Sequence, residues 1–132
     1  MADIGTGSGI LAITGIKFGA ASAVGIDNDE LVIDVAKENA KNNKVCCKCH
    51  FECKTADKLN DKFDFITANI LHNVLADIMG DFKLLMKDNA ILVLSGILDE
   101  KKQVVLDSIE QHGLKLIEET HQDIWTGLIV KN

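Results

Sequence analysis

A glycine-spaced segment near the start of the sequence limits the possible folds more than any other feature. Gly5, Gly7 and Gly9 lie between a short apolar run, residues 1–4, and an apolar segment, residues 10–18, that suits a helix. Glycine adopts backbone conformations that other residues avoid, and it lets a ligand approach the main chain closely. The segment therefore predicts a strand, a tight turn and a helix, with the turn as a candidate ligand site.

Strand-like and helix-like segments alternate along the rest of the chain. The sequence predicts seven strands, at residues 1–4, 22–26, 45–52, 63–68, 90–95, 114–119 and 124–130. The predicted helices cover residues 10–18, 29–42, 72–86 and 99–112, and Asp99 is the expected cap of the last one. This alternation is typical of an α/β protein with a doubly wound, mostly parallel sheet. No helix separates the last two strands, so we expect a C-terminal antiparallel hairpin.

Size and charge narrow the class of protein. The chain has 132 residues, which suits a single domain, and its formal charge of −6 disfavours a direct nucleic-acid binder. A small-molecule enzyme, or an enzyme with a basic protein substrate, fits that charge. No apolar run approaches the roughly 20 residues of a membrane span, and no secretory leader is recognisable. We therefore expect a cytoplasmic protein without membrane contacts, and the oligomeric state stays open.

Four cysteines lie close together, at Cys46, Cys47, Cys49 and Cys53. A zinc site would require a second CxxC pair or suitably spaced histidines, and the sequence has neither. A strand over residues 45–52 would also place Cys46 and Cys49 on opposite faces. We therefore predict no metal site, and we expect reduced thiols that pack as small apolar side chains.

The glycine spacing argues for a particular kind of ligand. The order G-x-G-x-G has Ile10 where a dinucleotide-binding fingerprint has its third glycine, and the Lys-Ser/Thr pair of a phosphate-binding loop is missing. Asp27 ends the second strand about 20 residues further on, where a carboxylate can accept hydrogen bonds from a ribose. The alternatives are a solvated acid in a turn and a helix N-cap, although Asp29 fits the cap role better.

Three further polar residues are candidates with open alternatives. Asp3 could hold loop amides or meet a cationic ligand group, or it could face solvent. Asp57, after the third strand, could accept from an adenine amine or belong to a surface loop. Asn69 follows the fourth strand, and its amide oxygen could orient a substrate amine, although its position taken alone favours a helix N-cap.

Three motifs together resemble a known family. Residues 3–12, Asp-Ile-Gly-Thr-Gly-Ser-Gly-Ile-Leu-Ala, resemble the opening of a class I methyltransferase domain. Residues 68–71, Ala-Asn-Ile-Leu, and residues 94–98, Leu-Ser-Gly-Ile-Leu, are similar to the ribosomal protein L11 methyltransferase family, as is Trp125. The resemblance runs through essentially the whole chain. From its own position in the last strand, Trp125 would be expected to pack in the core or on the sheet.

The resemblance implies a fold, a cofactor and a reaction. The fold would be Rossmann-like with a truncated first strand, and the chain would form a single domain over residues 1–132 without the family's N-terminal substrate-recognition domain. The cofactor would be S-adenosylmethionine, and the substrate would be lysine or N-terminal amines of ribosomal protein L11. Asn69 would be catalytic. The implied cofactor-binding residues are Asp3, Gly5, Thr6, Gly7, Gly9, Asp27, Asn28, Asp57 and Asn69. The alternatives are a truncated, non-catalytic cofactor-binding domain and a methyltransferase for another amine.

Overall fold

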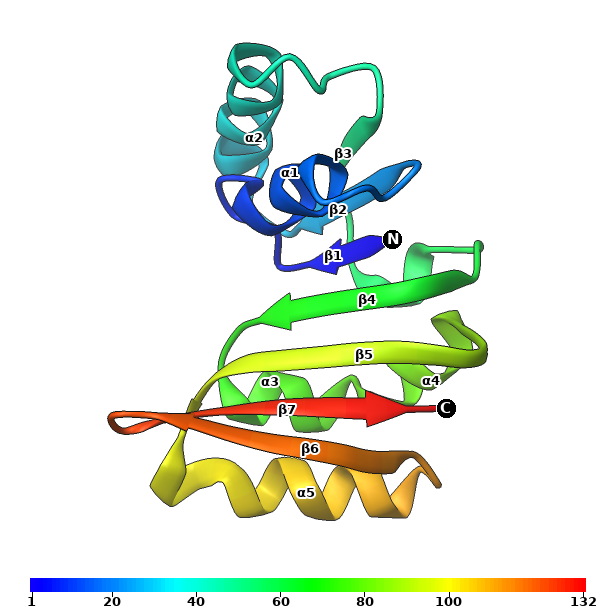
Figure 1. Ribbon diagram of the computed structural model, residues 1–132, viewed down its shortest axis with the longest axis vertical. Coiled ribbons are helices and arrows are strands. Elements are labelled where there is room, and N and C mark those ends of the chain that lie inside the picture. Colours follow the sequence, from blue (N-terminus) through cyan, green and yellow to red (C-terminus); the bar gives the residue numbers. More distant parts are fainter. The chain divides into compact units, whose positions relative to one another are not determined.

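The computed structural model describes all residues from 1 to 132, which form two compact units (Figure 1). Unit 1 comprises Met1–Leu59 and unit 2 comprises Asn60–Asn132. No helix in either unit is long and apolar enough to cross a lipid bilayer.

Unit 1 contains three parallel strands and two helices. Its elements are β1 (Ala2–Ile4), α1 (Ile10–Lys17), β2 (Ala23–Asp27), α2 (Glu30–Asn42), β3 (Cys49–Cys53) and the short 3-10 helix η1 (Ala56–Lys58). Strand β2 lies between β1 and β3 and runs parallel to both. The carboxyl ends of the three strands therefore lie at one edge of the sheet, which is where a ligand binds in folds of this type.

One apolar core holds unit 1 together. Helices α1 and α2 pack on the sheet through small and branched side chains, together with the buried ring of Phe51. The core residues are Ala12, Ile13, Ile16, Ala23, Ile33, Ala36, Ala40, Val45 and Phe51. Small residues such as Ala36 and Ala40 allow the helix backbones to approach the strands closely. Asp29 caps α2 by accepting a 2.9 Å hydrogen bond from the Leu31 N–H, as its position in the sequence predicts.

The third strand is shorter than the sequence predicts. Residues 46–48 form a turn, and β3 begins only at Cys49. The Val45 carbonyl accepts hydrogen bonds from the N–H groups of Lys48 and Cys49, at 2.9 and 3.1 Å. The prediction that Cys46 and Cys49 lie on opposite faces of one strand is therefore wrong, because local backbone hydrogen bonds close a turn where apolar composition suggested an extended segment.

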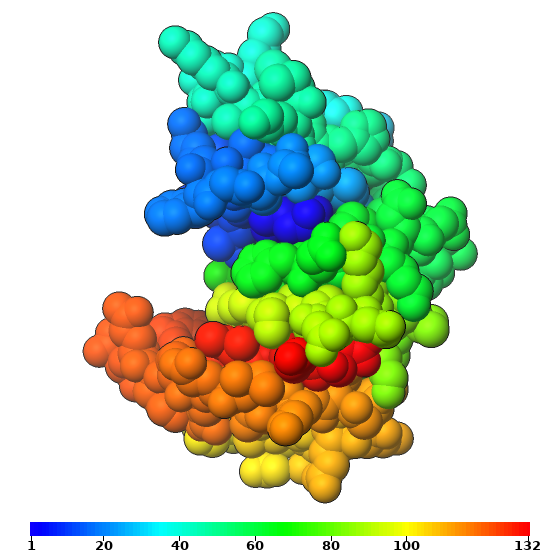
Figure 2. Space-filling view, turned by 45° about the vertical axis from the view of Figure 1, so that its right-hand side comes forward, coloured from blue at the N-terminus to red at the C-terminus, as the bar shows by residue number.

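Unit 2 contains four strands and its own helices. Its elements are β4 (Phe63–Asn69), α3 (His72–Asp77), α4 (Met79–Leu85), β5 (Met86–Leu98), the 3-10 helix η2 (Asp99–Lys101), α5 (Lys102–Gln111), β6 (Lys115–Gln122) and β7 (Trp125–Lys131). Within this unit the strand order is β4-β5-β7-β6. Strand β5 is parallel to β4 and antiparallel to β7, and β6 and β7 form the expected antiparallel hairpin. The hairpin tip, in orange, projects from the rest of the unit (Figure 1 and Figure 2).

Three predicted elements of unit 2 differ in detail. The helix predicted over residues 72–86 is interrupted at Ile78, where α3 ends and α4 begins. Strand β5 starts at Met86 rather than at residue 90, with a register shift against β4 and a left-handed residue, Asn89, at φ 61°. Asp99 does not cap α5; that helix begins after Lys101, and the Asp99 carboxylate binds other side chains instead.

The observed elements confirm the predicted fold class. Strands alternate with helices up to β5, the strand pairs β1–β2, β2–β3 and β4–β5 are parallel, and the last two of the seven strands form an antiparallel hairpin. This is an α/β, doubly wound and mostly parallel architecture.

Candidate functional site

The glycine loop between β1 and α1 has a backbone that only glycine adopts easily. Gly5, Gly7 and Gly9 have φ values of 73°, 53° and 81°. A side chain in this left-handed region costs roughly 1–2 kcal/mol for most residues. Gly9 is also the N-cap of α1, so the loop delivers the chain directly to the start of that helix.

Hydrogen bonds fix the loop against its surroundings in unit 1. The N–H groups of Gly5 and Thr6 both donate to the Ile26 carbonyl, at 2.9 and 2.8 Å, which folds the loop over the end of β2. From α2, the Asn39 side chain donates to the Ser8 carbonyl at 2.9 Å. The loop is therefore held in shape by the protein itself, and a ligand binding there would not have to order it.

Asp27 ends β2 and connects it to the glycine loop. Its Oδ2 accepts a 3.0 Å hydrogen bond from the Gly7 N–H, and its Oδ1 accepts a 3.1 Å bond from the Asp29 N–H. Both carboxylate oxygens therefore already have protein partners. The assignment of the helix cap to Asp29 had suggested that Asp27 would have none. Each oxygen of an ionised carboxylate can accept more than one hydrogen bond, so acceptor capacity remains. A ribose role for Asp27 stays a prediction.

Asp3 and Thr6 form a buried pair beneath the loop. Thr6 Oγ1 donates to Asp3 Oδ2 at 2.7 Å, and the two side chains are 4% and 1% exposed, for Thr6 and Asp3 respectively. Of the alternatives for Asp3, the geometry excludes a solvent-facing acid. The carboxylate shapes the glycine loop through the Thr6 hydroxyl, and a direct cofactor contact of either residue stays a prediction.

A close contact beneath the loop was not visible in the sequence. A methyl group added at Gly25 would lie 2.6 Å from the Phe51 ring and 2.7 Å from Thr6 Oγ1, and one added at Gly9 would lie 3.0 Å from the same ring. The Phe51 ring therefore packs directly against the backbone at Gly9 and Gly25, where a side chain would leave it no room. Only Gly25's place in a strand, where glycine often marks a close approach, could have indicated this.

The two remaining polar candidates of unit 1 lie at the surface. Asn28 is exposed beyond the end of β2, and Asp57 lies in η1 after β3. The Lys54 N–H donates to the Asp27 carbonyl at 3.0 Å and so ties the segment before η1 to the end of β2. A hydrogen bond from the Thr55 hydroxyl, followed by contacts with Lys58, lowers the pKa of Asp57. Asp57 is therefore an ionised acceptor near neutral pH, and its contact with an adenine stays a prediction.

The loop surface has room for a ligand. A methyl group added at Gly7 would meet no atom within 4 Å, so the space over this residue is open. Gly7 donates to Asp27, while that carboxylate and Asp57 offer negative charge at the same edge of unit 1. Ribose hydroxyls and an adenine amine are hydrogen-bond donors, and these acceptors suit them. The residues present therefore fit a nucleoside ligand better than a pyrophosphate, which carboxylates would repel.

Asn69 is the last residue of β4 in unit 2, and its side chain lies against a glycine of the neighbouring strand. Asn69 pairs with Ser95, and a methyl group at the next residue, Gly96, would collide with Asn69 Oδ1. Gly96 has φ 76°. The N-cap of α3 is Leu71, with no side-chain capping bond, so the helix-cap alternative for Asn69 is excluded. Its amide is therefore available for another role.

A cavity of about 280 Å³ adjoins Gly96 in unit 2. Its walls come from the end of β5 and from both strands of the hairpin: Ser95, Gly96, Thr120, His121, Gln122, Trp125, Thr126 and Gly127. Trp125 is 47% exposed, so of the two expected placements, in the core or on the sheet, the core is excluded. The hairpin turn carries it out to the carboxyl end of β5, where it pairs with Leu98 and lines the cavity.

A polar network joins the hairpin to the end of β5. Asp99 accepts hydrogen bonds from the Thr126 hydroxyl and contacts His121 Nδ1 at 3.0 Å. His121 Nε2 lies 2.8 Å from Glu119, which also pairs with Lys102. These contacts hold the cavity walls together, and sequence reasoning missed them because their members are distant in sequence.

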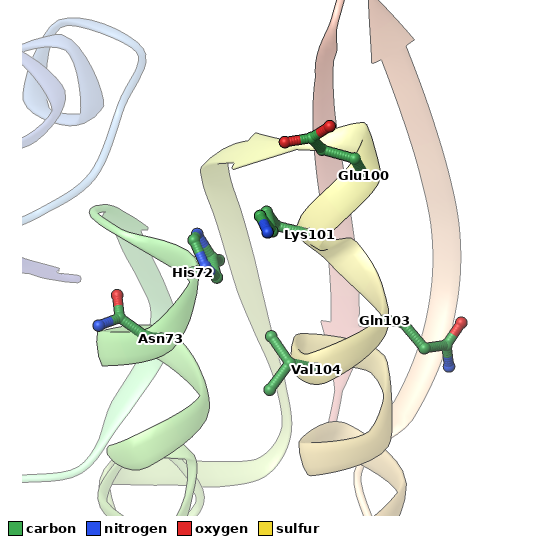
Figure 3. A pocket seen from close by; sticks show the side chains of 6 residues that line it. All are labelled: His72, Asn73, Glu100, Lys101, Gln103 and Val104. Atoms are coloured by element: carbon green, nitrogen blue, oxygen red, sulfur yellow. The ribbon is translucent and has the colours of Figure 1, made fainter.

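A second groove, of about 340 Å³, lies between the start of α3 and the η2–α5 segment (Figure 3). His72 and Asn73 line it from α3, and Glu100, Lys101, Gln103 and Val104 line it from the other side. In Figure 3 Val104 points toward α3 and Gln103 points away from it. None of the predicted site residues lines this groove. No group of three or more His, Cys, Asp or Glu side chains in the structure could hold a metal ion.

Comparisons with solved structures agree with this architecture. The ribosomal protein L11 methylase from Lactobacillus delbrueckii subsp. bulgaricus has a TM-score of 0.94 and 28% identity, covering 98% of this chain and 67% of that one. Magnesium protoporphyrin IX methyltransferase from Synechocystis, solved with bound SAM, has a TM-score of 0.79 and 18% identity, covering 98% and 68%. At that identity the likeness is one of fold, and the predicted cofactor is the one that this neighbour carries.

Sequence comparisons are more specific. The curated ribosomal protein L11 methyltransferase of Dictyoglomus thermophilum is 35% identical over 130 residues, covering 98% of this chain and 43% of that protein. This chain therefore spans about two fifths of the length of that relative. The family model described as ribosomal protein L11 methyltransferase matches residues 1–132, the full sequence. On these grounds the chain belongs to the ribosomal protein L11 methyltransferase family.

Proposed function

We propose that this chain is the methyl-transferring part of a protein N-methyltransferase that uses S-adenosylmethionine and acts on amines of ribosomal protein L11. The observation that carries the proposal is the preformed glycine loop, closed onto Asp27 by the Gly7 hydrogen bond and open above Gly7. Family membership supports both the cofactor and the substrate. A ribosomal protein substrate also supports the cytoplasm as the compartment.

The cofactor would lie against unit 1. Its ribose hydroxyls would donate to Asp27, its adenine amine would donate to Asp57, and the backbone of Gly5, Gly7 and Gly9 would permit close approach. Asp3 would keep the loop in shape through Thr6. Asn28, exposed next to Asp27, would cover the ribose edge. When bound, the sulfonium supplies an electrophilic methyl group, so the protein needs no covalent nucleophile.

Asn69 would receive the substrate amine. The amide oxygen would accept a hydrogen bond from the substrate N–H. This contact would direct the nitrogen lone pair at the methyl group and so raise the fraction of encounters that can lead to transfer. A lysine amine has an ordinary pKa of about 10.4, so it must lose a proton before attack. An amide is not a base in this range, and solvent would take that proton. Gly96 leaves the space that the Asn69 side chain needs.

The test has a binding arm and a transfer arm. Calorimetric titration of the chain with S-adenosylmethionine and with S-adenosylhomocysteine should show binding, and radiolabelled cofactor should label purified ribosomal protein L11. Mass spectrometry of the product would identify lysine or N-terminal amines. Binding without labelling would contradict the enzymatic part and support a non-catalytic cofactor-binding domain. Absence of binding at high ligand concentration would contradict the whole proposal.

Asn69 has a matched control in the same unit. Asn69→Ala should lower the transfer rate about tenfold or more, as loss of one positioning contact does, while cofactor affinity stays unchanged. Asn73→Ala removes an amide four residues further on, from α3, and should leave both quantities unchanged. Equal loss of binding and transfer in Asn69→Ala would contradict an orienting role.

A further inference from the structure

The turn before β3 carries thiols that the proposed function does not use. Cys46, Cys47, Cys49 and Cys53 are all free, and all but Cys49 are exposed. The turn is held at both ends. Val45 is buried in the core of unit 1, and the Lys48 carbonyl accepts a 2.8 Å hydrogen bond from the Ala23 N–H of β2.

The hydrogen bonds of this turn set the spacing of the thiols. Both Lys48 N–H and Cys49 N–H donate to the Val45 carbonyl, which is the pattern of a single helical turn. In such a turn residues three apart lie on the same side, with about 5–6 Å between their Cβ atoms. A disulfide needs about 3.5–4.5 Å between Cβ atoms, so Cys46 and Cys49 require only a small movement to join.

Two of the other pairings are less favourable. Cys46 and Cys47 are adjacent in sequence, which leaves no room for an unstrained ring. Cys49 and Cys53 are four residues apart on one extended strand, at about 3.3 Å per residue, and so lie too far apart. Burial raises the pKa of the Cys49 thiol, and the charges of Cys46 and Cys47 raise it further, which is consistent with three neighbouring sulfur atoms.

We propose that Cys46 and Cys49 are a preorganised dithiol that closes to an intrachain disulfide on reaction with a low-molecular-mass disulfide. The exposed Cys46 thiolate attacks one sulfur of that reagent, forms a mixed disulfide and releases the first thiolate. The Cys49 thiolate then attacks the Cys46 sulfur and releases the second. Two electrons pass from the dithiol to the reagent, and its two departing thiolates take up the two protons given up by the cysteine thiols, so the reagent leaves as two thiols.

Tryptic digestion shows whether a disulfide joins the two halves of the cysteine cluster. Trypsin cleaves after Lys44, Lys48 and Lys54, so it separates a peptide with Cys46 and Cys47 from a peptide with Cys49 and Cys53. The full chain is equilibrated with a mixture of reduced and oxidised glutathione, alkylated, digested and analysed by mass spectrometry. The expected product is one disulfide that links these two peptides.

Serine variants decide which thiols take part. The double variant Cys47→Ser/Cys53→Ser should keep the link, and Cys46→Ser should lose it. Because Cys46 is exposed, its replacement leaves the core of unit 1 intact. Loss of the link in the double variant, or its survival at equal yield in Cys46→Ser, would overturn the proposal. Glutathione adducts alone, without the link, would also overturn it.

A second measurement tests whether the fold of the turn favours the disulfide, beyond what the short separation of the two cysteines in sequence would do. The equilibrium constant for forming the disulfide against glutathione is compared in buffer and in concentrated urea. The folded turn should raise this constant at least about tenfold, because it raises the effective concentration of one thiol at the other. Equal constants would show that the folded turn does not favour the disulfide, and the proposal of a preorganised dithiol would then be wrong.

Discussion

Asp27 Oδ2 accepts a 3.0 Å hydrogen bond from the backbone N–H of Gly7, so one carboxylate fixes the distance between the end of β2 and the middle of the glycine loop. The two residues are 20 positions apart in sequence. Their contact gives the loop its shape before any ligand arrives. Under the proposed function, Asp27 would couple the geometry of the loop to cofactor affinity.

Replacing Asp27 should therefore weaken cofactor binding. Asp27→Ala removes a charged acceptor from the Gly7 N–H and from the expected ribose hydroxyls. Hydrogen bonds to charged groups contribute about 1.5–3 kcal/mol each, so we expect S-adenosylmethionine to bind about 10- to 100-fold more weakly by calorimetry. Asp29→Ala is the control, because it removes only the α2 cap. It should cost about 1 kcal/mol of stability without a change in affinity.

Gly25 should tolerate no side chain, although its position in β2 imposes no unusual backbone angle. A Cβ at this position would clash with Phe51 and with Thr6 Oγ1. Overpacking of this kind costs about 1–3 kcal/mol, so urea denaturation of Gly25→Ala should show a corresponding loss. In Gly80→Ala the new atom lies 3.4 Å from His112, an ordinary contact, and a helical Gly→Ala change should stabilise slightly. Equal stability of the two variants would contradict the packing argument.

Gly96 should matter for transfer rather than for cofactor binding. Gly96→Ala would push its Cβ against Asn69 Oδ1, and the position also has φ 76°. We expect about a tenfold loss of methyl transfer with unchanged S-adenosylmethionine affinity. In a protein that already carries Asn69→Ala, Gly96→Ala should cause no further loss of methyl transfer, because the amide side chain that it would displace is absent. Additive losses in the double variant would show that Gly96 acts by another route.

The network at the hairpin predicts a loss of stability in acid. The Thr126 hydroxyl and His121 lower the pKa of Asp99, and Lys102 and His121 lower that of Glu119. A carboxylate with a depressed pKa in the folded state stabilises the protein above its unfolded pKa, about 4, and loses that contribution as the pH falls through the folded value.

The acid dependence can be measured as a difference between two proteins. Stability of wild type and of Asp99→Asn is followed by denaturation from pH 7 to pH 2. The wild-type advantage at pH 7 should shrink as the pH drops below about 4, because the variant lacks that titrating group. An advantage that stays constant over this range would show that the ionisation of Asp99 does not contribute.

The order of elements was predictable because apolar spacing reports local structure directly. Strand β4 ends at Asn69, one residue beyond the predicted strand, and α2 begins after its expected cap Asp29, since both boundaries depend on neighbours in sequence. Two of the errors have a common cause. The turn at Cys46 and the side-chain contacts of Asp99 depend on hydrogen bonds that apolar spacing does not encode.

The sequence by itself predicted a glycine-rich turn between a strand and a helix as the candidate ligand site, because glycine adopts backbone conformations that other residues avoid, and it placed Asp27 and Asn69 at strand ends. Only the tertiary structure decided what these residues touch. Asp27 accepts a hydrogen bond from the Gly7 N–H, Asp3 is buried and accepts one from the Thr6 hydroxyl, and Trp125 lines a cavity. The reason is physical: backbone conformation follows from local residue types, whereas a side chain's partners are set by which distant segments pack beside it.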